Sequence, residues 1–157
     1  MNPEELTQVL QHVRQGQLSV EHALQRLRSL PYEDLGFASL DHHRSLRQGF
    51  PEVVLCEGKS TAQVVAIARA LFKKQGPFLA TRADPKVARA ICKLNRRAQY
   101  HPDARLVTVY PSRLRSLGHI LVVTAGTADL PVAEEARITA EVMGSRVERL
   151  YDVGVAG

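Results

Sequence analysis

The stretch HILVVTAGTADLPVAEEARITAEVMGSRVERLYDV (119–153) carries the strand, helix and strand pattern that decides the fold class. Residues 119–126 hold four consecutive apolar residues and end in small ones, which is typical of a buried strand followed by a turn. Residues 130–144 have helical spacing and stop at a glycine, and residues 145–153 have the pattern of a second strand. Because such connections within one sheet are right-handed crossovers, the stretch predicts a βαβ unit with parallel strands.

The same alternation of strand and helix is present upstream. Apolar runs at 53–56, 77–81 and 105–110 predict strands, and the intervening segments 60–76 and 83–95 have the spacing of helices. Alternation at this spacing predicts a small parallel or mixed sheet. The expected fold class is therefore α/β along most of the chain.

Residues 3–30 have the pattern of two short amphipathic helices. Gly16 is expected to end the first helix, and Ser19 is expected to cap the second. A pair of this size is not stable alone, so we expect it to dock on a larger domain.

The chain is expected to have three parts. A helical pair (1–30) docks on a small α/β domain with a parallel or mixed sheet (31–112), and a linker with an incomplete domain follows (113–157). The break falls in PSRLRSLG (111–118), which is basic and turn-forming. Two strands and one helix are fewer elements than an independent sheet normally needs, so we expect the apolar strand of the last part to lie partly uncovered.

Composition excludes several classes of protein. The chain has 157 residues, of which 45% are hydrophobic and 24% are charged, a balance typical of a globular domain. No apolar run approaches the roughly 18 residues of a membrane span, and the N-terminus has no secretory signal pattern. Cys56 and Cys92 form neither a disulfide framework nor a metal-ligand spacing, and DHHR (41–44) lacks a third ligand at a useful spacing. We expect a cytoplasmic protein with no membrane partner and no metal site, in which both cysteines pack as small apolar residues.

The net charge of +5 is unevenly distributed. Residues 51–118 hold thirteen Lys or Arg against four Asp or Glu, whereas residues 119–157 hold three against six. A basic block of this kind attracts nucleic acid, a phosphorylated small molecule or an acidic neighbouring subunit. Aromatic residues, which would stack on bases, make up only 5% of the chain, so a nucleic-acid partner is not expected.

Two turns with acidic residues follow the two strands of the βαβ stretch. TAGTAD (124–129) joins the first strand to the helix, and DVG (152–154) follows the second strand. Since the carboxyl ends of parallel strands meet at one edge of a sheet, we expect Asp152 to lie beside Asp129. The backbone N–H groups of such a turn and the positive end of the next helix are typical of a phosphate site.

The residues of the first turn have both a binding and a structural interpretation. Gly126 lets a ligand approach the backbone, Thr127 can donate a hydroxyl, and Asp129 can accept from a ribose hydroxyl. The alternative is that Thr127 and Asp129 only cap the helix, which is the commoner role of such residues. Lys59, at the start of an upstream helix, is a further candidate anion ligand, and a solvated lysine is its alternative.

Two blocks of the sequence resemble one known family. TAGTADLPVAEEARITAEVMG (124–144) followed by RLYDVGVAG (149–157) resembles the AIR carboxylase-like domain of LarB, a family of nickel pincer cofactor biosynthesis proteins. The upstream block LGFASLDHHRSLRQGFPEVVLCEGKSTAQ (35–63) is similar to the N-terminal signature of the same family, and the blocks occur in the family's order. The resemblance implies that residues 119–153 are the first βαβ of a truncated PurE-like, flavodoxin-like three-layer domain.

The resemblance implies a reaction of a pyridine dinucleotide. LarB-type enzymes carboxylate the pyridinium ring of nicotinic acid adenine dinucleotide (NaAD) with CO2 or bicarbonate and hydrolyse its phosphoanhydride, which releases AMP. A cysteine nucleophile first adds to the ring, because a cationic ring does not attack CO2 until a nucleophile has placed electrons in it. The resemblance further implies NaAD and AMP as ligands, no tightly bound cofactor, and a homo-oligomer that is an octamer in the intact family. A need for Mg²⁺ stays open.

The resemblance also assigns roles to single residues of this sequence. Thr127 and Asp129 hold the ribose and phosphate, and the backbone at Gly126 and Gly154 lines the pocket. Asp152 lies near the reacting ring, where it acts catalytically as an electrostatic partner or a proton acceptor.

The sequence departs from the family pattern at two points. Ala128 stands where the family's AGTSD turn has a serine, so one hydroxyl donor is missing. In the family, DVGVAG runs on to a His-Arg pair and to the segments that carry the nucleophilic cysteine, which neither Cys56 nor Cys92 matches. We therefore expect this chain to be a fragment that is inactive alone. The alternatives are a non-catalytic nucleotide-binding or assembly module and a purine-biosynthetic AIR carboxylase of the PurE type.

Overall fold

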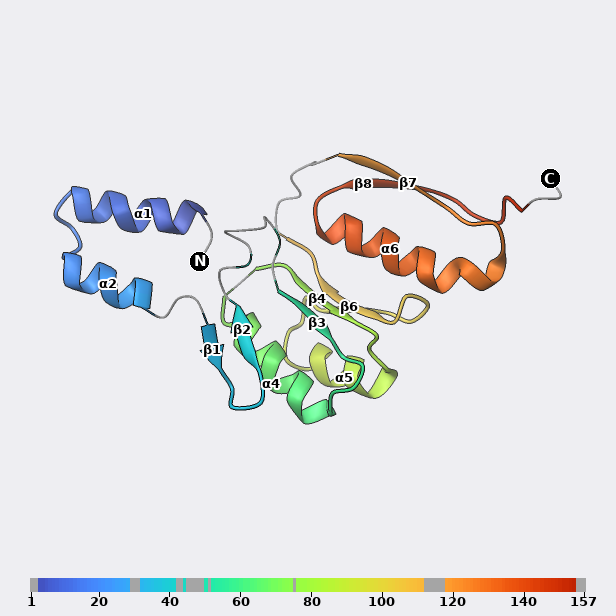
Figure 1. Cartoon of the computed structure of the whole chain (residues 1–157), viewed down its shortest axis with the longest axis horizontal. Coiled ribbons are helices and arrows are strands. Elements are labelled where there is room, and N and C mark those ends of the chain that lie inside the picture. The colour runs from blue at the N-terminus through green and yellow to red at the C-terminus, as the bar shows by residue number, and fades with distance from the viewer. Residues whose placement is uncertain are drawn as a thin grey trace. The chain divides into compact units, whose positions relative to one another are not determined.

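The computed structural model describes residues 3–28, 32–41, 44, 50, 52–74, 76–111 and 118–154. The chain divides into two compact units, Met1–Glu52 and Val53–Gly157 (Figure 1). Most of the predicted linker, together with His42 and His43 of the DHHR segment, lies outside the described residues. The division into three parts at residues 30 and 112 stays a prediction. No helix among the described residues has the length and apolar character needed to cross a membrane.

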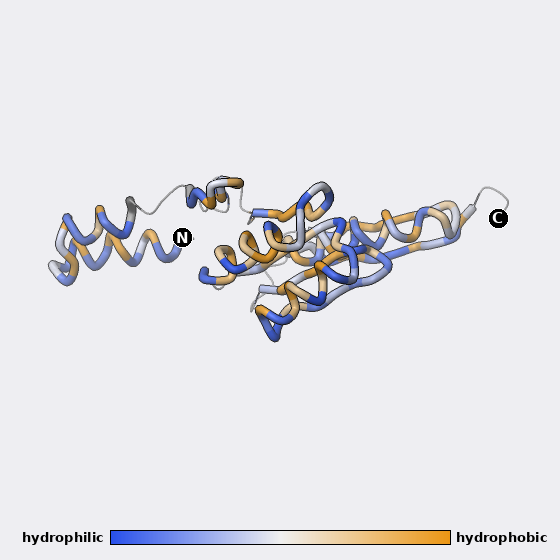
Figure 2. The backbone as a smooth tube through the Cα atoms, turned by 90° about the horizontal axis from the view of Figure 1, so that it is seen from below, coloured by the Kyte–Doolittle hydropathy of each residue, from blue (hydrophilic) through white to orange (hydrophobic). Residues whose placement is uncertain are grey.

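The first unit begins with two helices, α1 (Pro3–Arg14) and α2 (Val20–Arg28), which pack against each other. Gly16 has a φ of +70° in the turn after α1, a conformation that glycine adopts without strain. The Ser19 hydroxyl accepts a hydrogen bond from the His22 backbone N–H at 3.2 Å, which caps α2. Apolar and polar residues alternate along both helices in Figure 2, as expected for amphipathic helices. The two predicted helices are confirmed.

A two-stranded antiparallel hairpin follows, made of β1 (Tyr32–Asp34) and β2 (Ser39–Asp41). In its turn, Asp34 Oδ1 accepts the Gly36 N–H at 2.8 Å, and Gly36 has a φ of +80°. These strands were not predicted, because their mostly polar residues show no alternation of apolar and polar positions.

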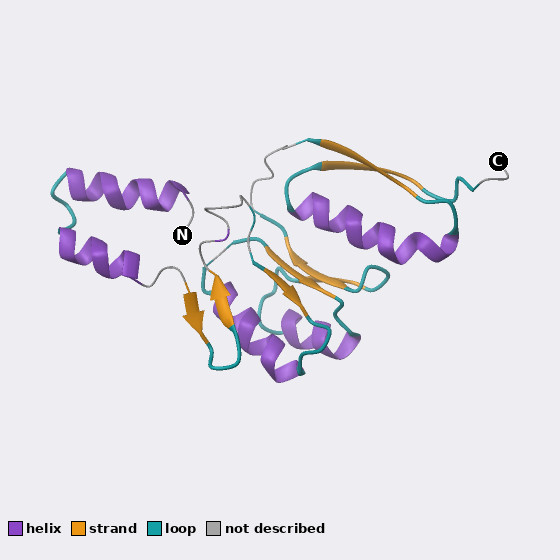
Figure 3. Cartoon of the chain, viewed as in Figure 1, coloured by secondary structure: helices purple, strands orange, loops and turns teal. Residues whose placement is uncertain are grey.

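The second unit contains a mixed sheet of four strands in the order β3-β4-β6-β5 (Figure 3). The strands are β3 (Val53–Leu55), β4 (Phe78–Thr81), β5 (Gln99–His101) and β6 (Leu106–Val109). β3 and β4 are parallel, whereas β6 is antiparallel to both β4 and β5. Of the predicted alternatives, a parallel or a mixed sheet, the structure has the mixed one, and three of its strands are confirmed. β5 was missed because it lacks an apolar run.

The helices α4 (Thr61–Phe72) and α5 (Pro85–Cys92) begin at strong sequence signals. Ser60 and Gln63 form a capping box, in which each side chain accepts the other's backbone N–H. The Asp84 carboxylate accepts a backbone N–H at 2.8 Å and caps α5, and proline occupies the first helical position. Both predicted helices are confirmed.

The predicted βαβ unit is formed by β7 (His119–Val123), α6 (Leu130–Val142) and β8 (Arg146–Leu150). Its two strands are parallel. A short 3-10 helix, η1 (Thr127–Asp129), leads from the turn after β7 into α6. The strand–helix–strand prediction and the parallel pairing are confirmed.

The two faces of the mixed sheet pack against different helices, because side chains alternate along each strand. Phe78 of β4 contacts Phe72 of α4, with 4.6 Å between the ring centroids. Leu79 faces the other side, where it forms a buried cluster with Leu106 of β6 and Ile138 of α6. The sheet therefore lies between α4 and α5 on one side and α6 on the other (Figure 1).

The strands of the βαβ unit are covered less completely than those of the mixed sheet. Leu121 and Val123 of β7 are 56% and 52% exposed, although β7 and β8 pack against α6. All residues of β6, by contrast, are buried. The expectation that the apolar strand lies partly uncovered is confirmed.

We expect Ile138→Ala to lower the free energy of unfolding by about 2–5 kcal/mol, because Ile138 is 1% exposed and joins α6 to Leu79 and Leu106. Val132→Ala is the matched control on the same helix, since Val132 is 66% exposed. That control should change the free energy of unfolding by less than about 0.5 kcal/mol. Urea denaturation followed by circular dichroism measures both values, and equal losses would contradict the packing of α6.

Candidate functional site

The two turns predicted to carry the site meet at one edge of the β7–β8 sheet. The Thr124 N–H, directly after β7, donates to the Leu150 carbonyl at the end of β8 at 3.1 Å. The Val153 N–H then donates to the Thr124 carbonyl, also at 3.1 Å. Backbone pairing thus continues past the strands and joins residues 124–129 to residues 151–154. We call these two segments together the acidic corner.

Thr124 and Gly154 set how closely the two turns approach. Thr124 is buried, and its Oγ1 accepts the Asp152 N–H at 3.3 Å. An added Cβ at Gly154 would lie 2.9 Å from the Ala125 carbonyl oxygen, so packing of one turn on the other requires glycine there. Thr124 was not among the predicted site residues, because its only sequence signal is a hydroxyl directly after four apolar residues.

Gly126 differs from Gly154 in having no structural reason to be glycine among the described residues. Its φ of −144° is extended backbone that any residue adopts. An added Cβ at Gly126 would meet no atom within 4 Å. The role of Gly126 in close approach of a ligand stays a prediction.

The carboxylates of the acidic corner are exposed and carry no structural bond. Asp129 immediately precedes α6, yet its side chain makes no capping hydrogen bond. Within the described part of the chain, the side chains of Thr127, Asp129 and Asp152 have no hydrogen-bond or ion-pair partner. Asp129 thus occupies the N-cap position of α6 without a side-chain capping bond, and the binding role of Thr127 and Asp129 stays a prediction.

Asp152 has a strained backbone. Its φ of +60° lies in the left-handed region, which costs a non-glycine residue roughly 1–2 kcal/mol, although aspartate adopts it more readily than most residues. The bonds that Asp152 and Val153 make to Thr124 hold this conformation. Strain of this kind occurs preferentially at binding and catalytic sites.

Lys59 lies next to the mixed sheet and not next to the β7–β8 sheet. It lies in the turn between β3 and α4, where its ammonium group donates to the Leu55 carbonyl at 2.8 Å. The described contacts do not bring it to the acidic corner, so its role as an anion ligand stays a prediction.

Both cysteines have the properties of packing residues. Cys56 is buried directly after β3, and burial raises the pKa of its thiol to about 11, against the opposing effect of Lys59. Cys92, at the end of α5, is half-buried, and burial raises its pKa as well. Because the thiolate is the reactive form of cysteine, neither residue is activated as a nucleophile.

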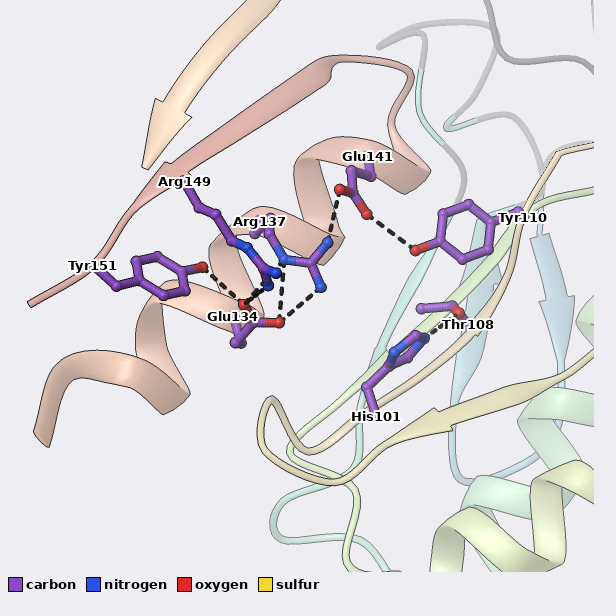
Figure 4. Close-up of polar contacts among 8 residues, drawn as sticks. All are labelled: His101, Thr108, Tyr110, Glu134, Arg137, Glu141, Arg149 and Tyr151. Atoms are coloured by element: carbon purple, nitrogen blue, oxygen red, sulfur yellow. Dashed lines mark hydrogen bonds and ion pairs between the residues drawn. The ribbon is translucent and has the colours of Figure 1, made fainter. Parts of the chain in front are cut away.

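A series of hydrogen bonds runs along α6 from the end of β6 to the acidic corner (Figure 4). The Tyr110 hydroxyl donates to Glu141 at 3.3 Å, and Arg137 donates to Glu141 at 2.7 Å. Arg137 also donates to both carboxylate oxygens of Glu134, at 2.7 to 3.1 Å. Tyr151, the first residue of the second turn, donates to Glu134 at 2.8 Å. This network was not predicted from the sequence, although its helical residues have the i+3 and i+4 spacing of ion pairs.

The network stabilises the charged form of Glu134. The hydrogen bonds from Arg137 hold the pKa of the Glu134 carboxyl below its usual range, and burial raises the pKa of both tyrosine hydroxyls. On neighbouring β5, burial and the charge of Arg137 lower the pKa of His101, whose ring bonds the buried Thr108 hydroxyl at 2.9 Å. Among the residues that the structure describes, no three His, Cys, Asp or Glu are grouped to hold a metal ion.

Comparison with known proteins identifies relatives of this chain. Residues 32–111 match the family model of the LarB/PurE-like N-terminal domain. An uncharacterised protein of Methanocaldococcus jannaschii is 31% identical over 160 aligned residues, which cover 97% of this chain. The match covers 62% of the relative, so this chain spans less than two thirds of that protein's length.

We expect Gly154→Ala to loosen the acidic corner, because the added Cβ would contact the Ala125 carbonyl oxygen at 2.9 Å. Overpacking of this kind costs about 1–3 kcal/mol, which should speed hydrogen exchange of the Val153 N–H by roughly 5-fold or more. Gly126→Ala is the matched control and should leave that rate within about twofold, since its Cβ meets no neighbour. Exchange measured by NMR checks both, and equal rates in the two variants would contradict the described approach of the turns.

Proposed function

The chain belongs to the LarB/PurE-like family, and from this membership and the acidic corner we propose that it forms part of the substrate pocket of a pyridinium-3,5-biscarboxylic acid mononucleotide synthase. Such an enzyme carboxylates the pyridinium ring of NaAD with CO2 and hydrolyses the phosphoanhydride, releasing AMP. The observation that carries the proposal is the pair of exposed carboxylates, Asp129 and Asp152, on two adjoining turns. Neither acid has a structural partner in the described part of the chain.

The acidic corner has groups suited to the phosphate, the ribose and the pyridinium ring of the nicotinate mononucleotide half of NaAD. In the proposal, the hydroxyls of the ribose donate to Asp129, and the phosphate lies at the positive N-terminal end of α6 near Thr127. Gly126 lets the ligand approach the backbone. The Asp152 carboxylate faces the pyridinium ring, whose positive charge it stabilises until the ring accepts a nucleophile.

The nucleophile of the proposed reaction is neither Cys56 nor Cys92. Addition to the ring needs a thiolate, and burial raises the pKa of both thiols. Since this chain spans 62% of the length of its relative, we assign the reaction to the whole protein and the acidic corner to this chain. The exposed apolar residues of β7 support a homo-oligomer, in which a second copy would cover them.

A second candidate function is a non-catalytic nucleotide-binding module. The observation that favours it is Ala128, which puts a methyl group where the resembled AGTSD turn has a hydroxyl donor. A missing hydroxyl donor would stabilise the charge of the transition state less, while the bound substrate would lose little affinity. Such a site would bind a nucleotide without catalysing the reaction.

We expect AMP and NaAD to bind the chain. Asp129→Ala and Asp152→Asn should each raise the Kd for NaAD about 10-fold or more, because a hydrogen bond or charge contact to a carboxylate is worth roughly 1.5–3 kcal/mol. Asparagine is chosen at 152 because it also tolerates a left-handed backbone. Isothermal titration calorimetry measures the affinities. Asp103→Ala, an exposed acid in the turn between β5 and β6, is the matched control and should leave the Kd unchanged. Binding that is insensitive to both corner acids would move the site elsewhere.

We expect residues 1–157 alone, incubated with NaAD and bicarbonate, to release no AMP above the background of the uncatalysed reaction. The physical reason is the low thiolate content of its two cysteines at neutral pH. Chromatography of the nucleotides measures the release. If the chain does release AMP and a Cys56→Ser or Cys92→Ser variant does not, then that cysteine is the nucleophile and our assignment is wrong.

A further inference from the structure

Tyr151 connects the last strand to the acidic corner. It follows β8 directly, and its hydroxyl donates to Glu134 Oε1 at 2.8 Å (Figure 4). The Arg149 guanidinium carbon lies 5.9 Å from the centroid of the Tyr151 ring, and an Arg149 nitrogen lies 3.6 Å from the same Glu134 oxygen. The Tyr151 side chain is therefore held at both its ring and its hydroxyl.

Glu134 is a well-oriented acceptor for that hydroxyl. Its side chain is only 16% exposed, and the fork of Arg137, which is 20% exposed, contacts both of its oxygens. Arg137 is in turn held by Glu141 at 2.7 Å. A forked arginine–carboxylate pair fixes orientation as well as charge, and such bonds are stronger where water is partly excluded. The helix beneath is anchored in the core by Ile138.

The second turn needs an anchor of this kind. Asp152 has a left-handed backbone, and the two bonds that this turn makes to Thr124, at 3.3 and 3.1 Å, both use backbone N–H groups at the end of a two-stranded sheet. Exposed segments with few buried contacts open most readily in a folded protein. The Thr124 bonds join this turn to the first turn. The bond from the Tyr151 hydroxyl to Glu134 joins it to α6.

We propose that Tyr151 is a positioning residue, whose hydrogen bond to Glu134 holds the second turn so that the Asp152 carboxylate faces the ligand bound at the first turn. The identity of that ligand, a pyridine dinucleotide, rests on the proposed function. The positioning itself is a property of the ligand-free chain and is measurable without a nucleotide.

Tyr110 provides a matched control on the same helix. Its hydroxyl also donates to a glutamate that Arg137 holds, Glu141, at 3.3 Å. Tyr110 lies directly after β6, at the mixed sheet and away from the acidic corner. Removal of its hydroxyl is therefore the same chemical change as in Tyr151→Phe at a different place. Tyr151→Phe and Tyr110→Phe both keep the ring and remove one O–H to carboxylate bond.

The first test is hydrogen exchange of the Val153 N–H in the full chain without ligand, measured by NMR. Tyr151→Phe should speed this exchange about 10-fold or more, as expected for loss of one hydrogen bond to a charged acceptor. Tyr110→Phe should leave it within about twofold, and both variants should keep the exchange rates of the buried amides of β6. An unchanged Val153 rate in Tyr151→Phe, or an equal increase in Tyr110→Phe, overturns the proposal.

The second test is titration of the same variants with NaAD and with AMP. Tyr151→Phe should raise the Kd for NaAD about 3- to 10-fold, with a smaller effect on AMP, which lacks the ring that Asp152 faces. Tyr110→Phe should bind both nucleotides as the wild-type chain does. Equal NaAD affinity in Tyr151→Phe and wild type overturns the positioning role. A wild-type chain that binds neither nucleotide overturns the proposed function instead, and the exchange rates then decide whether Tyr151 holds the turn.

Discussion

Helix α6 packs against two sheets at once, and the place of every residue of the acidic corner depends on it. One side of the helix inserts Ile138 and Val142 into the cluster formed with Leu79 and Leu106 of the mixed sheet. Another side covers β7 and β8, whose ends form the acidic corner. Because protein interiors are close-packed, the helix cannot slide along one sheet without losing contacts to the other. The apolar residues of α6 thereby fix the acidic corner relative to the mixed sheet.

The charged residues of α6 add orientation to this packing. Arg137 lies between Glu134 and Glu141 with little solvent around it, so an unpaired guanidinium there would be costly. A partly buried ion pair of this kind contributes little net stability compared with an apolar substitute, because desolvation offsets the attraction. What it does supply is a fixed direction for each carboxylate, to which Tyr110 and Tyr151 then donate. The network thus orients the side chains between the two sheets, and its net contribution to the free energy of unfolding is small.

The sequence predicted the elements that have strong local signals. Helices with a capping residue, such as Ser60 and Asp84, and strands with a continuous apolar run were found at nearly their observed bounds. The hairpin β1–β2 and strand β5 were missed, since polar strands depend on their neighbours for stability. The adjacency of the two acidic turns followed from the parallel-strand rule alone. The bond from Tyr151 to Glu134 did not, because it joins residues 17 positions apart and depends on the height of α6 above β8.

The charges around the acidic corner favour a ligand with both signs of charge. Several other acids of this unit are paired, as Glu135 is with Arg82 at 3.4 Å and Glu148 with His119 at 3.1 Å. Asp129 and Asp152 are left exposed, although the chain has a net charge of +5. Two carboxylates repel a simple anion such as inorganic phosphate, whereas the end of α6 beside them attracts one. The proposed ligand joins a phosphate to a cationic ring and so meets both conditions, if the phosphate binds at the helix end and the ring against the carboxylates.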